Sequence, residues 1–112
     1  MSTKKQRADF VKRVEAFVKK IGGEDHPNVA KGSYGSTLQI ETIFGRLSLW
    51  PKPAEKKDRI WTIFAKFDEP ERAKEKLPCN PYSGKWNFHC SEPEYLFADF
   101  KRQLGAIVEG SV

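Results

Sequence analysis

Hydrophobic residues recur every three or four positions near both ends of the chain, as they do on one face of an amphipathic helix. This spacing predicts a first helix over about residues 8–21, ended by Gly22, and a last helix over about residues 92–109, ended by Gly110. Residues 1–7 are expected to be frayed. The apolar stripes consist of Phe10, Val14, Phe17, Val18 and Ile21 in the first helix, and of Leu96, Phe97, Phe100, Leu104, Ile107 and Val108 in the last.

Between these helices, apolar and polar residues alternate, which is typical of strands with one buried face. A tight reversal is predicted at Gly45-Arg46, and Pro51 is predicted to end the second strand because it cannot donate to a ladder. The third strand is apolar on both faces. It is either central and covered on both sides, or it exposes aromatic residues to a ligand. The strands are predicted over residues 38–44, 47–50 and 59–67, after a glycine-rich loop over residues 22–35.

A tight turn and a fourth strand are predicted within residues 80–90. Asn80-Pro81 favours a turn, and Gly84 is free to take a positive φ where the strand begins. Alternation then separates an apolar face from a polar one. The polar face is either an ordinary solvated surface or a binding row. The apolar face carries Trp86, Phe88 and Cys90, and the polar face carries Lys85, Asn87 and His89.

Two strand-to-helix junctions share one sequence pattern. Residues 68–71 and residues 91–94 each place a capping residue before a proline, with a glutamate three positions after the cap, which predicts a capping box at each helix start. The first junction begins a short helix over about residues 69–77. The element order is therefore α-β-β-β-α-β-α. We expect a single α+β domain over residues 1–112, with a four-stranded, mostly antiparallel sheet packed with the N- and C-terminal amphipathic helices.

The positive charge of the chain lies in the first predicted helix. The net charge is +5, and residues 1–20 alone carry seven basic and two acidic side chains, whereas the remaining residues carry 13 of each sign. A basic segment of this kind favours nucleic acid or an acidic protein surface, and a solvated helix has the same composition. The candidate binding residues in this helix are Lys12, Arg13, Lys19 and Lys20.

Composition indicates a globular, cytoplasmic protein. Hydrophobic residues make up 38% of the chain, and no apolar run approaches the ~18 residues of a membrane span. The sequence shows no export signal, and two cysteines without such a signal favour a reducing compartment. We therefore expect a protein of the cytoplasm that does not associate with membranes.

The residues most often used in metal sites and nucleophilic catalysis are not arranged for either. Cys79, His89 and Cys90 lack paired C-x-x-C spacing, and neighbours such as His89 and Cys90 point to opposite faces of a strand. A nucleophile and base formed by these two residues fails for the same reason. We therefore expect no enzymatic activity and no cofactor.

Aromatic and basic residues of the predicted sheet can share an outward face. Aromatic rings on a sheet can stack on bases while basic groups contact phosphates, and the same residues would equally serve a protein partner. Trp61 and Trp86 are expected to be buried. If a helix covers this face, both forms of sheet-face binding are wrong. The candidate binding residues here are Phe64, Lys66, Tyr82, Lys85, Asn87 and His89.

Residues 67–74 (FDEPERAK), followed by residues 79–89 (CNPYSGKWNFH), resemble a group of small uncharacterised proteins from bacteriophages and mobile elements. The run NPYSGKWNFH is the specific part of this resemblance. The resemblance implies an origin in a phage or mobile element, a location in the cytoplasm of a bacterial host, and no catalytic residue. Small phage proteins of this kind are often accessory factors that bind host machinery or defence complexes, and inhibitors of CRISPR systems are among them.

These observations lead us to expect a non-enzymatic accessory protein that binds a host protein or nucleoprotein complex. Inhibition of a defence system such as CRISPR is one role of this kind. The alternative is a nucleic-acid-binding protein that uses the basic helix and the aromatic and basic face of the sheet.

Overall fold

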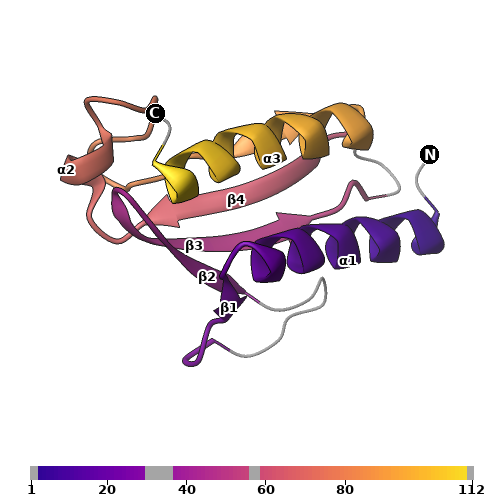
Figure 1. The fold of residues 1–112 in the computed structure, drawn as a ribbon. Coiled ribbons are helices and arrows are strands. Elements are labelled where there is room, and N and C mark those ends of the chain that lie inside the picture. Colours follow the sequence, from indigo (N-terminus) through magenta and orange to yellow (C-terminus); the bar gives the residue numbers. More distant parts are fainter. Residues whose placement is uncertain (1–2, 30–36, 56–58, 111–112) are drawn as a thin grey trace.

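The chain folds as a long helix, a series of strands and a second long helix (Figure 1). The structure is a computed structural model that describes residues 3–29, 37–55 and 59–110. A short helix precedes the last strand. In chain order the elements are α1 (Lys4–Lys20), β1 (Glu24–Asp25), β2 (Leu38–Thr42), β3 (Gly45–Lys52), β4 (Trp61–Phe67), α2 (Pro70–Ala73), β5 (Phe88–Cys90) and α3 (Pro93–Glu109).

The strands form one antiparallel sheet in the order β1-β2-β3-β4-β5, so that each strand pairs with the next along the chain. The register places Leu47 opposite Phe67 and Ile63 opposite Phe88. This confirms the predicted α+β fold with an antiparallel sheet, although the described part of the chain contains five strands instead of four. The additional strand, β1, lies in the segment that we predicted to be a loop. It consists of two exposed acidic residues, so no hydrophobic alternation marks it in the sequence.

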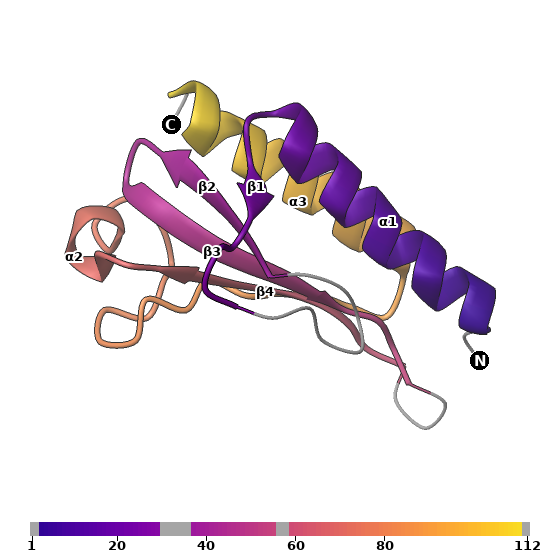
Figure 2. The ribbon, with the colours of Figure 1, turned by 90° about the horizontal axis from the view of Figure 1, so that it is seen from below.

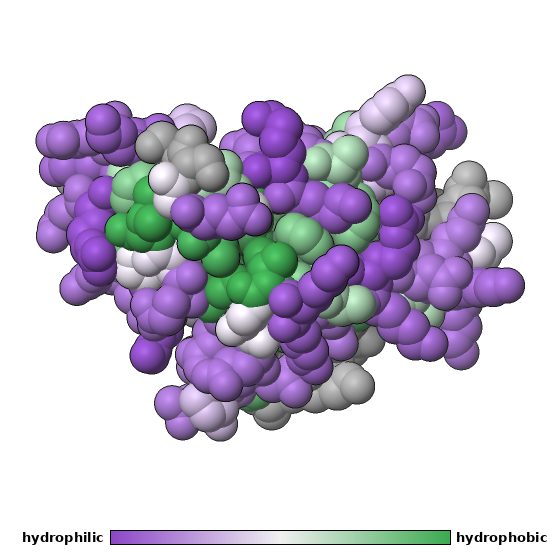
Figure 3. All heavy atoms as spheres, viewed as in Figure 1, coloured by the Kyte–Doolittle hydropathy of each residue, from purple (hydrophilic) through white to green (hydrophobic). Residues whose placement is uncertain are grey.

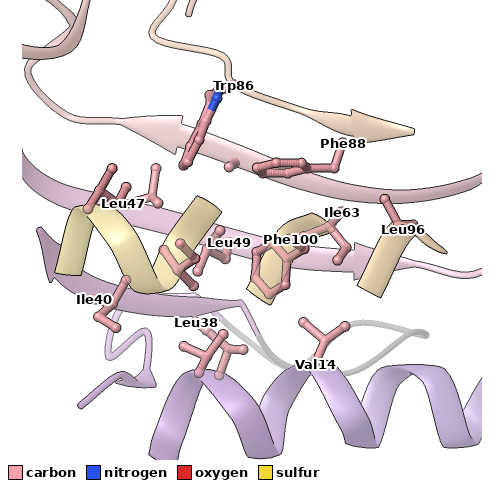
Figure 4. Close-up of a cluster of buried hydrophobic side chains, with 14 of the residues drawn as sticks. Val14, Leu38, Ile40, Leu47, Leu49, Ile63, Trp86, Phe88, Leu96 and Phe100 are labelled. Atoms are coloured by element: carbon pink, nitrogen blue, oxygen red, sulfur yellow. The ribbon is translucent and has the colours of Figure 1, made fainter. Parts of the chain in front are cut away.

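Both long helices pack on the same face of the sheet (Figure 2). Alternate residues of β3 and β4 are buried beneath the helices, and the residues between them face the other side. Figure 4 shows Val14 of α1 and Phe100 of α3 directed toward the same layer of strand side chains. The Phe100 ring makes edge-on contacts with Phe17 and Phe88, with ring centroids 6.0 and 5.4 Å apart. The hydrophobic core therefore lies between one face of the sheet and the two helices.

An apolar area remains visible between the two helices on this side of the molecule, surrounded by hydrophilic residues (Figure 3). Ile43, in the turn between β2 and β3, is exposed, while Ile21 and Val108 are partly buried against the core. This area is separated by the sheet from the surface that carries Phe64, Lys66 and Lys85.

The first helix begins earlier than the apolar stripe predicts. The Thr3 hydroxyl accepts a hydrogen bond from the backbone N–H of Gln6, and the Gln6 side chain accepts one from the backbone N–H of Thr3. This capping box satisfies two donors at the helix start. Residues 4–7, which we expected to be frayed, are therefore helical, and α1 has a defined first turn.

The predicted capping boxes at the other two helices are wrong, although both helices begin close to the predicted positions. The residues that precede the helices are Glu69 and Glu92, and neither side chain accepts a capping hydrogen bond from a backbone N–H of its helix. A proline in the first turn marks each start instead, since its missing N–H leaves no unpaired donor there. The helix α2 has only four residues and is shorter than predicted. The helix α3 ends as predicted, with Gly110 at a φ of +80°.

The reversal between β2 and β3 also differs from the prediction. The turn lies at Ile43 and Phe44, and Gly45 already begins β3 with a φ of +96°. The following strand continues through Pro51, which we expected to end it. The first residue of β2, Leu38, pairs with Leu49. Among the described strands, the only neighbour at Pro51 is therefore β4, and a missing N–H is tolerated there.

Candidate functional site

The face of the sheet opposite α1 and α3 is not covered by either helix (Figure 2). We call this surface the open face. On it, residues from neighbouring strands stand directly opposite one another, because antiparallel partners in register point to the same side. Three rows of such partners cross β3 and β4, and two of these rows continue, one to Lys85 just before β5 and the other to His89 in β5. The rows are Trp50 with Phe64, Ser48 with Lys66 and Lys85, and Lys52 with Thr62 and His89.

A stacked aromatic pair forms the middle row. The rings of Trp50 and Phe64 have centroids 5.2 Å apart and an interplanar angle of 22°. Trp50 is 37% exposed, whereas Trp61 and Trp86 are buried in the core, as predicted for those two residues. A cross-strand aromatic pair stabilises a sheet by about 0.2–1 kcal/mol. It also leaves a flat, partly apolar surface in contact with water.

Two lysines face each other at one side of the aromatic pair. Lys66 on β4 and Lys85, just before β5, are partners in an antiparallel bridge, and both are exposed. Like charges directly opposite one another destabilise a sheet. Within the described part of the chain neither lysine forms an ion pair. The positive charge at this position is therefore available to an external anion.

The third row adds a lysine and a histidine at the other side of the aromatic pair. Lys52 is partly buried, and no ion pair to it is found among the described residues. His89 is exposed, and its Nδ1 lies 3.1 Å from the hydroxyl oxygen of Thr62. This hydrogen bond orients the imidazole ring on the sheet. Basic groups thus lie on both sides of the stacked rings.

Asn87 has a structural role that the sequence did not reveal. Its side-chain Oδ1 accepts a hydrogen bond from the backbone N–H of Ala65, at 3.2 Å. The neighbouring N–H of Trp86 donates to the carbonyl oxygen of Ala65 at 2.9 Å. The Asn87 side chain thus takes the place of a backbone acceptor where β5 is interrupted. We predicted Asn87 as part of the binding row, but a partner could bind its Oδ1 only in competition with this bond.

Tyr82 lies at the tip of the turn that leads into β5 and is 94% exposed. The turn is held by Asn80, whose Oδ1 accepts hydrogen bonds from the N–H groups of Tyr82 and Ser83. It is joined to β4 by a hydrogen bond from the Phe67 N–H to the Gly84 carbonyl oxygen, 3.0 Å long. Tyr82 is therefore close in sequence to the lysine pair but is not part of the three rows.

The basic residues of α1 are less available than their charge suggests. Arg13 donates to both carboxylate oxygens of Glu94 on α3, at 2.5 and 3.0 Å, and its guanidinium lies 4.5 Å from the centroid of the Phe97 ring. The hydrogen bonds of this pair hold the pKa of Glu94 below its ordinary value and raise the pKa of Arg13. Lys19 forms an ion pair with Asp25 at 3.2 Å.

The predicted binding residues consequently fall on two separate surfaces. Among the described residues, Lys12 and Lys20 form no ion pair, and they belong to α1, on the helix side of the sheet. Phe64, Lys66 and Lys85 belong to the open face. The structure does not bring these groups together into one site.

Trp50 and Lys52 were not among the predicted binding residues. Lys52 was missed because Pro51 was predicted to end the strand before it. Trp50 lay inside the predicted strand, alternating with Leu47 and Leu49, but was not assigned to the outward face. Extended by two residues, the strand alternates Arg46, Ser48, Trp50 and Lys52 on one face, and this face is the solvent-facing one.

Two hollows lie on the described surface. A cleft of about 520 Å³ lies between β5 and α3 and is lined by His89, Cys90 and Tyr95, among others, while a smaller one of about 290 Å³ lies beside Gly22 and Gln39. Both cysteines are free. In the part of the chain that the structure describes, no group of three or more histidine, cysteine, aspartate or glutamate residues could hold a metal ion.

Across the described ranges, no helix has the length and apolar character needed to cross a membrane. Comparison with protein-family models, with curated proteins and with solved structures finds no match for this chain.

Proposed function

We propose that this protein is a non-enzymatic accessory protein that binds a host protein or nucleoprotein complex through the open face of its sheet. The observation that carries this proposal is the stacked pair of Trp50 and Phe64 beside the lysine pair of Lys66 and Lys85, on a face that neither long helix covers.

The energetics of this surface support a binding role. Opposed lysines without an acidic partner lower the stability of a sheet, so the fold itself gains nothing from them. Exposed tryptophan is among the residues that contribute most to macromolecular interfaces. Lys66 and Lys85 therefore have a clearer role in binding than in folding, whereas Trp50 can serve both.

The resemblance of residues 67–74 and 79–89 to phage and mobile-element proteins supports the cytoplasm of a bacterial host as the place of action. Inhibition of a defence complex such as a CRISPR system is one activity consistent with such an origin. A role for the basic helix as the main binding element receives less support, because Arg13 and Lys19 are engaged in ion pairs within the protein.

Affinity capture from bacterial lysate tests the proposal. Three baits are compared: the wild-type protein, the open-face variant Trp50→Ala/Phe64→Ala, and the control Lys12→Ala/Lys20→Ala on the helix side. A partner counts only when it is identified by mass spectrometry and binds again in purified form. We expect such a partner to be retained by the wild type and the control and lost by the open-face variant. Equal retention by all three baits would overturn the assignment of binding to the open face.

A further inference from the structure

We propose that the open face binds single-stranded nucleic acid, with bases stacked on Trp50 and Phe64 and phosphates bound by Lys66, Lys85 and Lys52. This inference rests on the proposed function, because it uses the same face and names the chemistry that the face recognises.

The rows of the sheet give this surface the layout that a single strand requires. Alternate residues along a strand lie about 6.6–6.8 Å apart, so each basic row lies one such step from the aromatic row. The lysine pair of Lys66 and Lys85 is on one side, and Lys52 with His89 is on the other. An oligonucleotide that runs along β3 and β4 can therefore place a base on the rings and a phosphate on either side. Aromatic residues carried on a sheet, flanked by basic groups, bind single strands in this way.

Two properties of this surface favour a single strand: the small extent of its positive charge, compared with an acidic protein patch, and its exposed rings, compared with a duplex. The next row toward β2 holds Arg46 and Glu41 in an ion pair of 3.2 Å, which is neutral. Among the described residues of the open face, the positive charge without an ion-pair partner therefore lies in the two rows beside the rings. Base faces are stacked inside a duplex and are free in a single strand, so Trp50 and Phe64 can stack on the bases of a single strand but not on those of a duplex. Other surfaces, such as the apolar area between the helices, carry no comparable indication of their partner.

The test is fluorescence anisotropy with labelled oligothymidine and oligouridine of about 12 nucleotides, which is within the range that single-strand-binding folds cover. A duplex of the same length is the comparison. We expect micromolar binding to at least one single strand and weaker binding to the duplex. Preference for thymidine or uridine decides between DNA and RNA as the source of the strand.

Two variants test the assigned roles. Trp50→Ala should weaken binding by about 5- to 150-fold, the range for loss of one base stack. Lys66→Ala/Lys85→Ala should make the slope of log K against log salt less negative by about 1.4, which is the loss of two phosphate contacts on a single strand. Lys12→Ala/Lys20→Ala is the matched control and should leave affinity and slope unchanged.

The variant Trp50→Phe tests whether weaker binding of Trp50→Ala comes from the missing aromatic ring or from a loss of folded structure. It keeps an aromatic surface and should bind nearly as the wild type does. Because Trp61 and Trp86 are buried, quenching of tryptophan fluorescence by the oligonucleotide should disappear in Trp50→Phe. Binding that survives Trp50→Ala but is lost in the helix control would overturn the inference.

Failure of this inference can be distinguished from failure of the proposed function. If no oligonucleotide binds at low salt, the nucleic-acid inference is wrong. The proposed function still stands in that case if nuclease-treated lysate yields a purified protein partner that is lost with Trp50→Ala/Phe64→Ala.

Discussion

The turn that leads into β5 depends on Gly84 having no side chain. Gly84 has a φ of +74°, and a Cβ added there would lie 2.5 Å from the carbonyl oxygen of Phe67. The left-handed conformation costs an L-residue about 1–2 kcal/mol. Because the carbonyl belongs to a paired strand, the turn itself would have to move away. That movement breaks the hydrogen bond from the Phe67 N–H to the Gly84 carbonyl oxygen, and a buried donor left unpaired costs about 1–3 kcal/mol.

We therefore predict that Gly84→Ala lowers the free energy of unfolding by about 2–5 kcal/mol. This is a large part of the roughly 5–15 kcal/mol that stabilises a typical domain. Urea unfolding followed by tryptophan fluorescence measures it. With an m-value of about 1–3 kcal/mol per molar urea, the midpoint should fall by roughly 1 M or more.

Two other glycines provide matched controls. Gly22 has a φ of +109° with no other atom within 4 Å of an added Cβ, so Gly22→Ala isolates the conformational cost of about 1–2 kcal/mol. Gly105 lies within α3 with the same free space, and Gly105→Ala should stabilise the protein by about 0.5–1 kcal/mol. If Gly84→Ala costs no more than Gly22→Ala, the close approach of the turn to β4 is contradicted.

Three further substitutions test the core, the ladder and the link between the helices. Phe100→Ala should cost about 3–5 kcal/mol of unfolding free energy, because the side chain is fully buried, and a cost below 1 kcal/mol would contradict its place in the core. Asn87→Ala should lower the free energy of unfolding by about 1–3 kcal/mol, because it leaves the Ala65 N–H unpaired. Asn87→Asp keeps an acceptor and should lower it by less. Equal losses for the two variants would contradict the hydrogen bond between Asn87 and Ala65. The hydrogen bond from Arg13 lowers the folded-state pKa of Glu94, so its contribution to stability is present above the unfolded-state pKa and is lost as the pH falls through the folded-state pKa. The urea midpoint of Glu94→Gln should therefore lie below that of the wild type at neutral pH and converge with it at acid pH, below the folded-state pKa of Glu94. A difference that persists there would contradict the ion pair.

The sequence predicts the fold well where burial follows a simple period. The alternation around Trp86 and Phe88 identifies the buried side of the last strand, and the helical stripe identifies Phe100 as a core residue. Gly84 adopts the positive φ that its place in the turn indicated. These features are local, because each depends on residues within one or two turns of the chain.

The site is harder to predict because it depends on contacts between distant segments. Arg13 appears in the sequence as one more basic residue, and only the packing of α1 against α3 pairs it with Glu94. The exposure of Trp50 follows from both helices lying on the other face of the sheet, which the order of elements does not determine. Asn87 occupies a backbone position in the ladder only because β5 is interrupted there.

Amine-reactive labelling of lysines, followed by mass spectrometry, tests most directly whether a partner occupies the open face. The protein is labelled alone, with a single-stranded oligonucleotide, and with a purified partner from affinity capture. Binding on the open face predicts reduced labelling of Lys66 and Lys85, with no change at Lys12 and Lys20. Protection of Lys12 and Lys20, with Lys66 and Lys85 labelled as in the free protein, would contradict it.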